Sequence, residues 1–355
     1  MLLPRELLML VASFGARAAV RLARTCRAAW ETHGSNPALW WLALSVKHAE
    51  KWRSLFTSGR PRPGVPALVY DTPFTKVLHA GRDSLLVHSW SGTHMILRRK
   101  SEWRKLFIPS NAMIEHHAVS PDGKWICHSG GETTCVYKVR GDKLHVALRV
   151  ERELIAECAG MTNTTIVGRG KNDRFYWHNF AEGTSGAVPE PATGGRWWSR
   201  RLVAMSEDVL VFGIREKLRV QDYGGKKLAA VARPERTCAH GRHVYMLYKD
   251  ARRAGRSPLH TVYTLRLVCL DARTGAKTER RVHDVEIYLE SMGDLGVCAS
   301  RRFVAVNAQA SVLVLRAASL ELLHTLADTW AQPVALADAT LFFSRNGGVW
   351  AVDLE

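Results

Sequence analysis

The sequence predicts a mainly β protein, a seven-bladed β-propeller preceded by a small all-α domain. Helical periodicity is confined to the first part of the chain, up to about residue 56. From about residue 66 onward, short β-type runs bounded by Gly, Asp, Asn and Ser follow one another. We therefore divide the 355 residues into a helical domain at 1–56, a linker at 57–65 and a propeller at 66–355.

The β-type runs recur with a period. The third strand of each repeat can be followed through Ile96, Val136, Tyr176, Val220, Val268, Leu313 and Trp350. Successive gaps are 40, 40, 44, 48, 45 and 37 residues, which is the spacing of four-stranded propeller blades. The last repeat supplies only three runs, and the run at 66–70 has no repeat of its own. We expect that run to take the outer position of the last blade and close the ring, which removes open sheet edges.

Three turns within the repeats share a recognisable form. Residues Val119-Ser120-Pro121-Asp122-Gly123-Lys124 have the composition of the first hairpin of a blade. The runs at 270–275 and 221–225 look like turns into an outer strand. These segments resemble WD-type repeats, although the Gly-His and Trp-Asp dipeptides of typical WD repeats are missing. The resemblance implies a WD-like propeller.

The N-terminal helical pattern begins with a proline that suits the first turn of a helix, Pro4. Leu7, Leu8, Val11 and Phe14 then form one apolar face. A second apolar pattern runs through residues 20–30. Three short helices cannot bury all these side chains among themselves, so we expect part of this surface to face a partner.

The same segment resembles the F-box family. The resemblance rests on Leu3-Pro4, the apolar stripe, Cys26-Arg27-Ala28-Ala29-Trp30 and Leu39-Trp40, in that order. It implies that the chain is the substrate-recognition subunit of an SCF-type, cullin-RING ubiquitin ligase, with catalysis left to its partners. A Skp-type adaptor and a cullin scaffold would be those partners. The implied adaptor contacts are Leu3, Pro4, Leu7, Leu8, Val11 and Leu22.

Two other interpretations of the N-terminal segment stay open. Residues 1–30 carry five arginines and one acidic residue, a composition also typical of a mitochondrial transit peptide. The helices could instead form a cap on the next domain. The whole chain could then be a structural propeller within a large assembly, and its N-terminus would never meet an adaptor.

The composition indicates in which cellular compartment the protein is expected. No apolar run reaches the roughly 18 residues that a membrane span needs, and no secretory signal is visible. The seven cysteines are an odd number without a Cys-x-x-Cys pair, which favours a reducing compartment over a disulfide framework. We expect a cytosolic or nuclear protein with no membrane association.

The chain is strongly basic, with 50 Lys and Arg against 33 Asp and Glu and a formal net charge of +17. Such a charge favours an acidic partner: an acidic or phosphorylated protein segment, or nucleic acid. The alternative is a positive charge spread evenly over the surface with no specific partner. We favour a protein substrate, because no recognised nucleic-acid-binding motif is present.

The loops predicted on one face of the propeller collect basic residues. Turns between second and third strands share a face with the links between blades, and arginine there suits carboxylate or phosphate. The longest turn, 249–256, is the strongest candidate, because a loop of that length is usually functional or disordered. The predicted substrate-binding residues are Arg169, Lys171, Trp197, Arg200, Arg215, Lys217, Lys249, Arg252, Arg253, Arg256 and Arg345.

Motifs of catalysis are absent from the sequence. We find no Gly-x-Ser-x-Gly, His-Glu-x-x-His or P-loop pattern, and 168–170 reads as a turn between strands. Metal-ligand residue types gather at His116, His117, Cys127, His128 and Cys135. They fall on several strands and alternate in direction, so their spacing does not imply one ion. We expect a non-catalytic protein without a cofactor or a bound metal.

Overall fold

The structure is a computed structural model, and it describes residues 67–71, 76–81, 84–89, 92–99, 102–107, 116–130, 133–140, 143–151, 154–189, 200–254, 260–288, 295–308, 311–327, 335–345 and 348–355. The chain divides into two compact units, Met1–Val65 and Pro66–Glu355, and every described residue belongs to the second. The helical domain predicted at 1–56 and the linker at 57–65 lie outside the described residues. Within the described part, no helix has the length and apolar character to cross a membrane.

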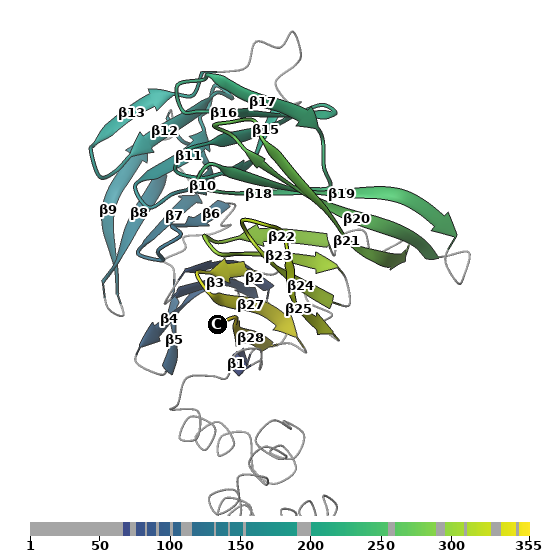
Figure 1. The fold of residues 1–355 in the computed structure, drawn as a ribbon. Coiled ribbons are helices and arrows are strands. Elements are labelled where there is room, and N and C mark those ends of the chain that lie inside the picture. Colours follow the sequence, from purple (N-terminus) through teal and green to yellow (C-terminus); the bar gives the residue numbers. More distant parts are fainter. Residues whose placement is uncertain are drawn as a thin grey trace, which may run out of the picture. The chain divides into compact units, whose positions relative to one another are not determined.

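The described residues form a mainly β propeller of four-stranded antiparallel sheets (Figure 1). Each of the first three sheets follows the chain order from one edge to the other. Their strands are β2 (Lys76–Gly81), β3 (Ser84–Ser89), β4 (Gly92–Arg99) and β5 (Glu102–Phe107); β6 (His116–Val119), β7 (Trp125–Gly130), β8 (Thr133–Arg140) and β9 (Lys143–Glu151); β10 (Glu157–Met161), β11 (Thr165–Arg169), β12 (Phe175–Asn179) and β13 (Thr184–Ala187).

The next three sheets repeat this order, and the last one combines strands from both ends of the described part. These strands are β14 (Arg200–Met205), β15 (Leu210–Ile214), β16 (Lys217–Gln221) and β17 (Lys227–Ala232); β18 (Arg236–His240), β19 (His243–Ala254), β20 (His260–Asp271) and β21 (Lys277–Tyr288); β22 (Leu295–Ala299), β23 (Phe303–Ala308), β24 (Ser311–Arg316) and β25 (Leu322–Ala327); β26 (Ala335–Ala337), β27 (Thr340–Arg345), β28 (Gly348–Asp353) and β1 (Ala67–Asp71).

We number the sheets as blades 1 to 7 in the order just given and call their strands A to D, starting from the first strand named. Each residue used to trace the repeat, from Ile96 to Trp350, lies in strand C of its blade. In blade 7 the D position belongs to β1, which pairs antiparallel with β28. The chain thus returns to the sheet in which its described part begins.

The A strands lie on the inside and close the ring. Each one contacts the A strand of the next blade, from β2 through β6, β10, β14, β18, β22 and β26, and β26 contacts β2 again. Because all strands within a blade are antiparallel, A–B and C–D turns lie on one face of the ring. The B–C turns and the links between blades lie on the other. We refer to these as the A–B face and the B–C face.

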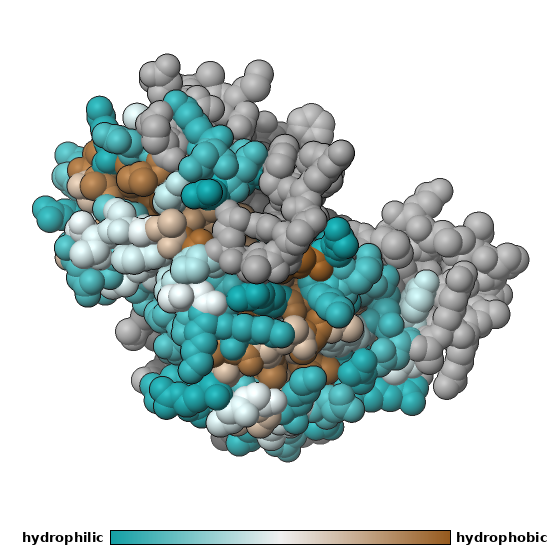
Figure 2. Space-filling model, turned by 90° about the horizontal axis from the view of Figure 1, so that it is seen from above, coloured by the Kyte–Doolittle hydropathy of each residue, from teal (hydrophilic) through white to brown (hydrophobic). Residues whose placement is uncertain are grey.

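The hydrophobic core lies between neighbouring blades. Val77, Leu85 and Val87 of blade 1 pack against Phe342 and Val349 of blade 7. On the other side of blade 7, Phe343 belongs to a cluster shared with blade 6. Consecutive residues of one strand thus serve two interfaces, because side chains alternate between the faces of a sheet. The visible outer surface is mostly polar, with apolar side chains gathered in separate areas (Figure 2).

Buried hydroxyl groups at the ends of four A strands organise the A–B turns. Ser120, Thr162, Ser206 and Ser300 are each at most 5% exposed, and each accepts a hydrogen bond from a backbone N–H of its own turn. Two of them also connect blades. Ser206 Oγ donates to the carbonyl of Gly241 at 2.5 Å, and Ser300 Oγ donates to the carbonyl of Asp338 at 2.7 Å. These bonds fix neighbouring A–B turns against each other.

The prediction of a long loop at 249–256 is wrong for most of its length. Residues 249–254 continue β19 and pair with the first half of β20, with one bulge between Asp250 and Arg252. The Arg-rich composition suggested a loop, but the alternating β-branched and aromatic residues at 260–265 provide a partner strand. β19, β20 and β21 are each 12 residues long and extend well beyond the other strands (Figure 1).

Closure of the ring can be tested at the interface of blades 7 and 1. Phe342 is 2% exposed and lies in the cluster that joins the two blades. We expect Phe342→Ala to lower the free energy of unfolding by about 3–5 kcal/mol, because it leaves a cavity where neighbouring sheets meet. Chemical denaturation measures the change. Leu322→Ala, at a side chain 39% exposed on β25, is the control, and an equal loss in both variants would contradict the assignment.

Candidate functional site

Three of the predicted substrate-binding residues have described, exposed side chains, and all three lie on the B–C side of the blades. Lys171 lies in the β11–β12 turn, and Arg215 and Lys217 lie at the β15–β16 turn. Arg215 has φ +52°, a left-handed conformation that few non-glycine residues adopt. It closes a two-residue turn, and Lys217 begins the next strand opposite Ala232.

Two of the predicted residues form ion pairs within the protein. Arg169 forms an ion pair with Asp173 in the same turn, with Nε donating to Oδ1 at 2.8 Å. Lys249 Nζ lies 3.3 Å from Glu235 Oε1 and 5.1 Å from the Tyr263 ring centroid, and its side chain is 8% exposed. A buried, paired ammonium is poorly placed to meet a ligand. For Lys249 the substrate-binding prediction therefore finds no support.

The remaining predicted residues have no described side chains. Arg200, Arg252, Arg253 and Arg345 lie on strands, at β14, β19 and β27, and only their backbone positions are described. Trp197 and Arg256 lie outside the described residues. So do all six predicted adaptor contacts: Leu3, Pro4, Leu7, Leu8, Val11 and Leu22.

Arg233, which the sequence prediction missed, joins the exposed cations of blade 4. It lies in the link after β17 and donates from Nη1 to the carbonyl of Arg215 at 3.2 Å. Its backbone N–H donates to the carbonyl of Glu216 at 2.9 Å. The link is therefore fastened to the B–C turn. We call Arg215, Lys217 and Arg233 the basic corner. The fold brings these residues together, since Lys217 and Arg233 are 16 positions apart in the sequence.

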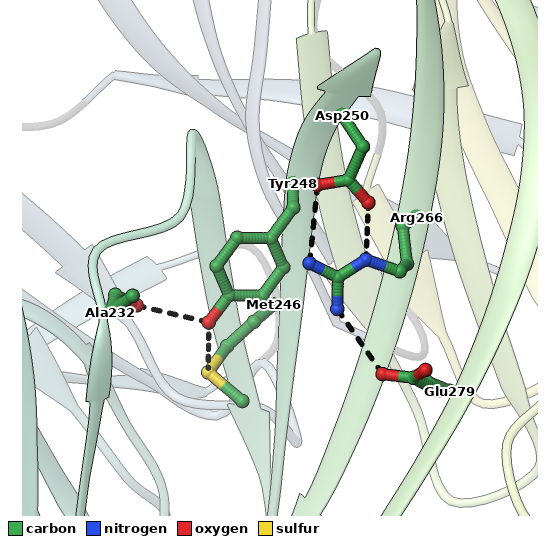
Figure 3. Close-up of polar contacts among 6 residues, drawn as sticks. All are labelled: Ala232, Met246, Tyr248, Asp250, Arg266 and Glu279. Carbon is green, nitrogen blue, oxygen red and sulfur yellow. Dashed lines mark hydrogen bonds and ion pairs between the residues drawn. The ribbon is translucent and has the colours of Figure 1, made fainter.

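A charged network stiffens the long strands of blade 5. Arg266 on β20 forms an ion pair with Asp250 on β19 and donates from Nη1 to Glu279 Oε2 on β21 at 3.2 Å (Figure 3). Its guanidinium also lies 4.8 Å from the Tyr248 ring centroid. The hydrogen bonds to Asp250 raise the pKa of Arg266 above the already high value usual for arginine, so its guanidinium is always charged. Tyr248 in turn donates to the carbonyl of Ala232 at 2.9 Å, which ties blade 5 to blade 4.

An axial cavity of about 440 Å³ lies at the A–B face, inside the ring. All seven blades line it, which agrees with the closed order of the A strands. Its wall is mainly apolar, and its polar side chains include His117, His240, Arg301 and Asp338. Burial lowers the pKa of His240, so this imidazole is neutral at neutral pH. The sequence prediction missed this cavity because its lining is spread over the whole length of the propeller.

The histidines and cysteines singled out in the sequence lie in blade 2. His117 and His128 are cross-strand neighbours, and their rings stack with centroids 5.3 Å apart and planes inclined by 13°. Cys127 precedes His128 and is fully buried, and burial raises the pKa of its thiol. In the part of the chain that the structure describes, no group of three or more His, Cys, Asp or Glu side chains could hold a metal ion.

Comparison with known proteins supports the fold. No family model matches the sequence, and no curated protein matches it. Among solved structures, Porphyromonas gingivalis PorZ, an essential bacterial surface component of the type-IX secretion system, is similar with a TM-score of 0.51 at 11% identity. The match covers 82% of this chain and 38% of that one.

Two further solved structures have slightly lower scores. Saccharomyces cerevisiae Sqt1 is similar with a TM-score of 0.48 at 12% identity, over 81% of this chain and 85% of that one. The β-propeller domain of Myceliophteria thermophila Cps50 (Swd1) is similar with a TM-score of 0.47 at 13% identity, over 81% of this chain and 100% of that one. At these identities the similarity concerns the fold alone. The F-box resemblance therefore depends only on the sequence of the first forty residues.

The role of Arg266 can be tested by hydrogen exchange. Arg266→Met keeps the aliphatic stem but leaves Asp250 and Glu279 without their shared cation. We expect amide protection to fall in 248–254 and 260–266, because removing charge-assisted hydrogen bonds costs about 1–3 kcal/mol. Arg316→Met is the control, since Arg316 makes an exposed pair with Glu321 in blade 6. Unchanged exchange in blade 5 would contradict a stiffening role.

Proposed function

We propose that this chain is a non-catalytic protein-interaction scaffold that binds an acidic or phosphorylated protein segment through the basic B–C face. In its specific form, the proposal makes the chain the substrate-recognition subunit of an SCF-type ubiquitin ligase. The N-terminal segment would dock the Skp-type adaptor and, through it, the cullin scaffold. The chain would then act by proximity, holding a substrate lysine near charged ubiquitin. A cytosolic or nuclear location is part of this proposal.

The basic corner is the observation that supports ligand binding best. Arg215, Lys217 and Arg233 are exposed and come from a turn, a strand and a link that meet on one face. The described residues provide no ion pair for any of the three. Guanidinium groups bind carboxylate and phosphate with two parallel hydrogen bonds, so two arginines beside a lysine suit a doubly charged segment. Lys171 in the neighbouring blade would extend the surface.

Charge reversal tests the basic corner. We expect Arg215→Glu with Lys217→Glu to weaken binding of a labelled decapeptide bearing two phosphoserines by at least about tenfold, because attraction becomes repulsion. Fluorescence anisotropy of the full chain at physiological salt measures the affinity.

Blade 4 also supplies the matched control. Lys226 and Lys227 are exposed at its C–D turn, on the A–B face. Lys226→Glu with Lys227→Glu changes the net charge equally, so the peptide should bind this variant almost as well as the unchanged chain. Equal weakening in both variants would show that the general positive charge attracts the peptide, and it would contradict a site at the basic corner.

The ligase proposal has its own test. We expect the purified full chain to retain a Skp-type adaptor in a pull-down, and Leu3→Ala with Pro4→Ala and Leu7→Ala to abolish retention, since these residues are the contacts that the resemblance implies. The control is the charge-reversed basic corner, which should retain the adaptor fully. Failure of the unchanged chain to bind would contradict the ligase role and favour a structural propeller in a larger assembly.

A further inference from the structure

The axial cavity has the size and lining of a small-molecule site. Its volume of about 440 Å³ falls within the range of such pockets, roughly 300–1,000 Å³. Its apolar wall includes Leu86, Met161, Met205 and Leu336, from four different blades. Met205 packs so closely on Gly160 that a Cβ there would lie 2.3 Å from its sulfur. Methionine side chains adapt readily to a bound apolar group.

Two opposite charges lie at the open end of this cavity. Arg301 and Asp338 both line it, and both are exposed at their A–B turns. They are on neighbouring blades, and the hydrogen bond from Ser300 Oγ to the carbonyl of Asp338 joins the two turns that carry them. The described part of the chain nevertheless provides no ion pair for either residue, with each other or with a third group. Each charge is therefore available to a ligand.

The fold holds the backbones of the two turns that carry these charges together. Ser300, next to Arg301, is 4% exposed and donates to the carbonyl of Asp338 at 2.7 Å. Asp338 has φ +54°, a left-handed conformation that costs free energy for any residue with a Cβ. The left-handed turn and the bond between blades therefore fix the backbone of Asp338 at the cavity mouth. A cation and an anion on two joined turns at one cavity, neither in an ion pair with another described residue, are complementary to a zwitterion.

We propose that the axial cavity binds a free α-amino acid with an apolar side chain. The α-carboxylate meets the Arg301 guanidinium, the α-ammonium meets the Asp338 carboxylate, and the side chain enters between Met161, Met205 and Leu336. This ligand pairs both charges and fills the apolar interior. An internal residue of a polypeptide carries neither charge, so the site selects the free amino acid. The site lies on the face opposite the basic corner, so it is independent of that ligand surface.

Three leucine-based probes, together with glycine, test this assignment on the full chain by titration calorimetry. Leucine carries both charges, N-acetylleucine only the carboxylate, and leucinamide only the ammonium. We expect leucine to bind, and each of the other two to bind at least tenfold more weakly. Glycine, which has both charges and no side chain, should bind more weakly than leucine, because it leaves the apolar wall without contact.

Two variants test which residue binds the carboxylate of the ligand and which binds its ammonium group. With Arg301→Gln, leucine should lose its advantage over leucinamide, because the carboxylate partner is gone. With Asp338→Asn, leucine should lose its advantage over N-acetylleucine. Arg302→Gln is the control, since Arg302 is adjacent in sequence but forms an ion pair with Glu355 and does not line the cavity. It should leave leucine binding unchanged, and thermal unfolding of all three variants checks that each is folded.

Several outcomes would overturn the proposal. Leucine failing to bind at millimolar concentration would exclude an amino-acid site. N-acetylleucine binding as tightly as leucine would show an anion site at Arg301 alone, and leucinamide doing so would show a cation site at Asp338 alone. Equal loss in Arg301→Gln and Arg302→Gln would show a general charge effect. None of these results depends on whether the basic corner or the adaptor-binding segment functions as proposed.

Discussion

The burial of apolar side chains between neighbouring sheets is the interaction on which the rest of this structure depends. A four-stranded sheet has two faces, and in a propeller each face must be covered by the next blade. Val77 and Phe342 show the requirement most clearly, because they join blades 1 and 7. Without that contact, two apolar faces would be open to water. The cavity, the basic corner and the long strands of blade 5 are all positioned by this ring.

Much of the ring could be predicted from the sequence, because a repeated supersecondary unit leaves a repeated spacing. The residues from Ile96 to Trp350 mark strand C in every blade, and the turns at 119–124 and 270–275 lie between strands as their composition indicates. Strand length was less predictable. The run 249–254 contains a lysine, an aspartate and two arginines, and only its pairing with β20 shows that it continues β19.

The functional surface was harder to predict, since exposure and pairing are properties of the folded chain. Lys249 and Lys217 look alike in the sequence, yet one is buried against Glu235 and the other is exposed. Arg233 gave no local signal, because its neighbours are brought to it by a link between blades. The cavity was beyond prediction for the same reason. Its charged residues are only two among the many Arg and Asp residues of the chain.

The pairing of β1 with β28 also has a consequence for how the protein folds during synthesis. Among the described strands of the ring, β1 leaves the ribosome first, and its hydrogen-bonding partner β28 leaves last. The pairing of Leu68 with Trp350 is therefore a contact of very high sequence separation. Such contacts form late and slow the folding rate. Until then β1 is an unpaired strand, and unpaired strand edges are a common starting point for aggregation.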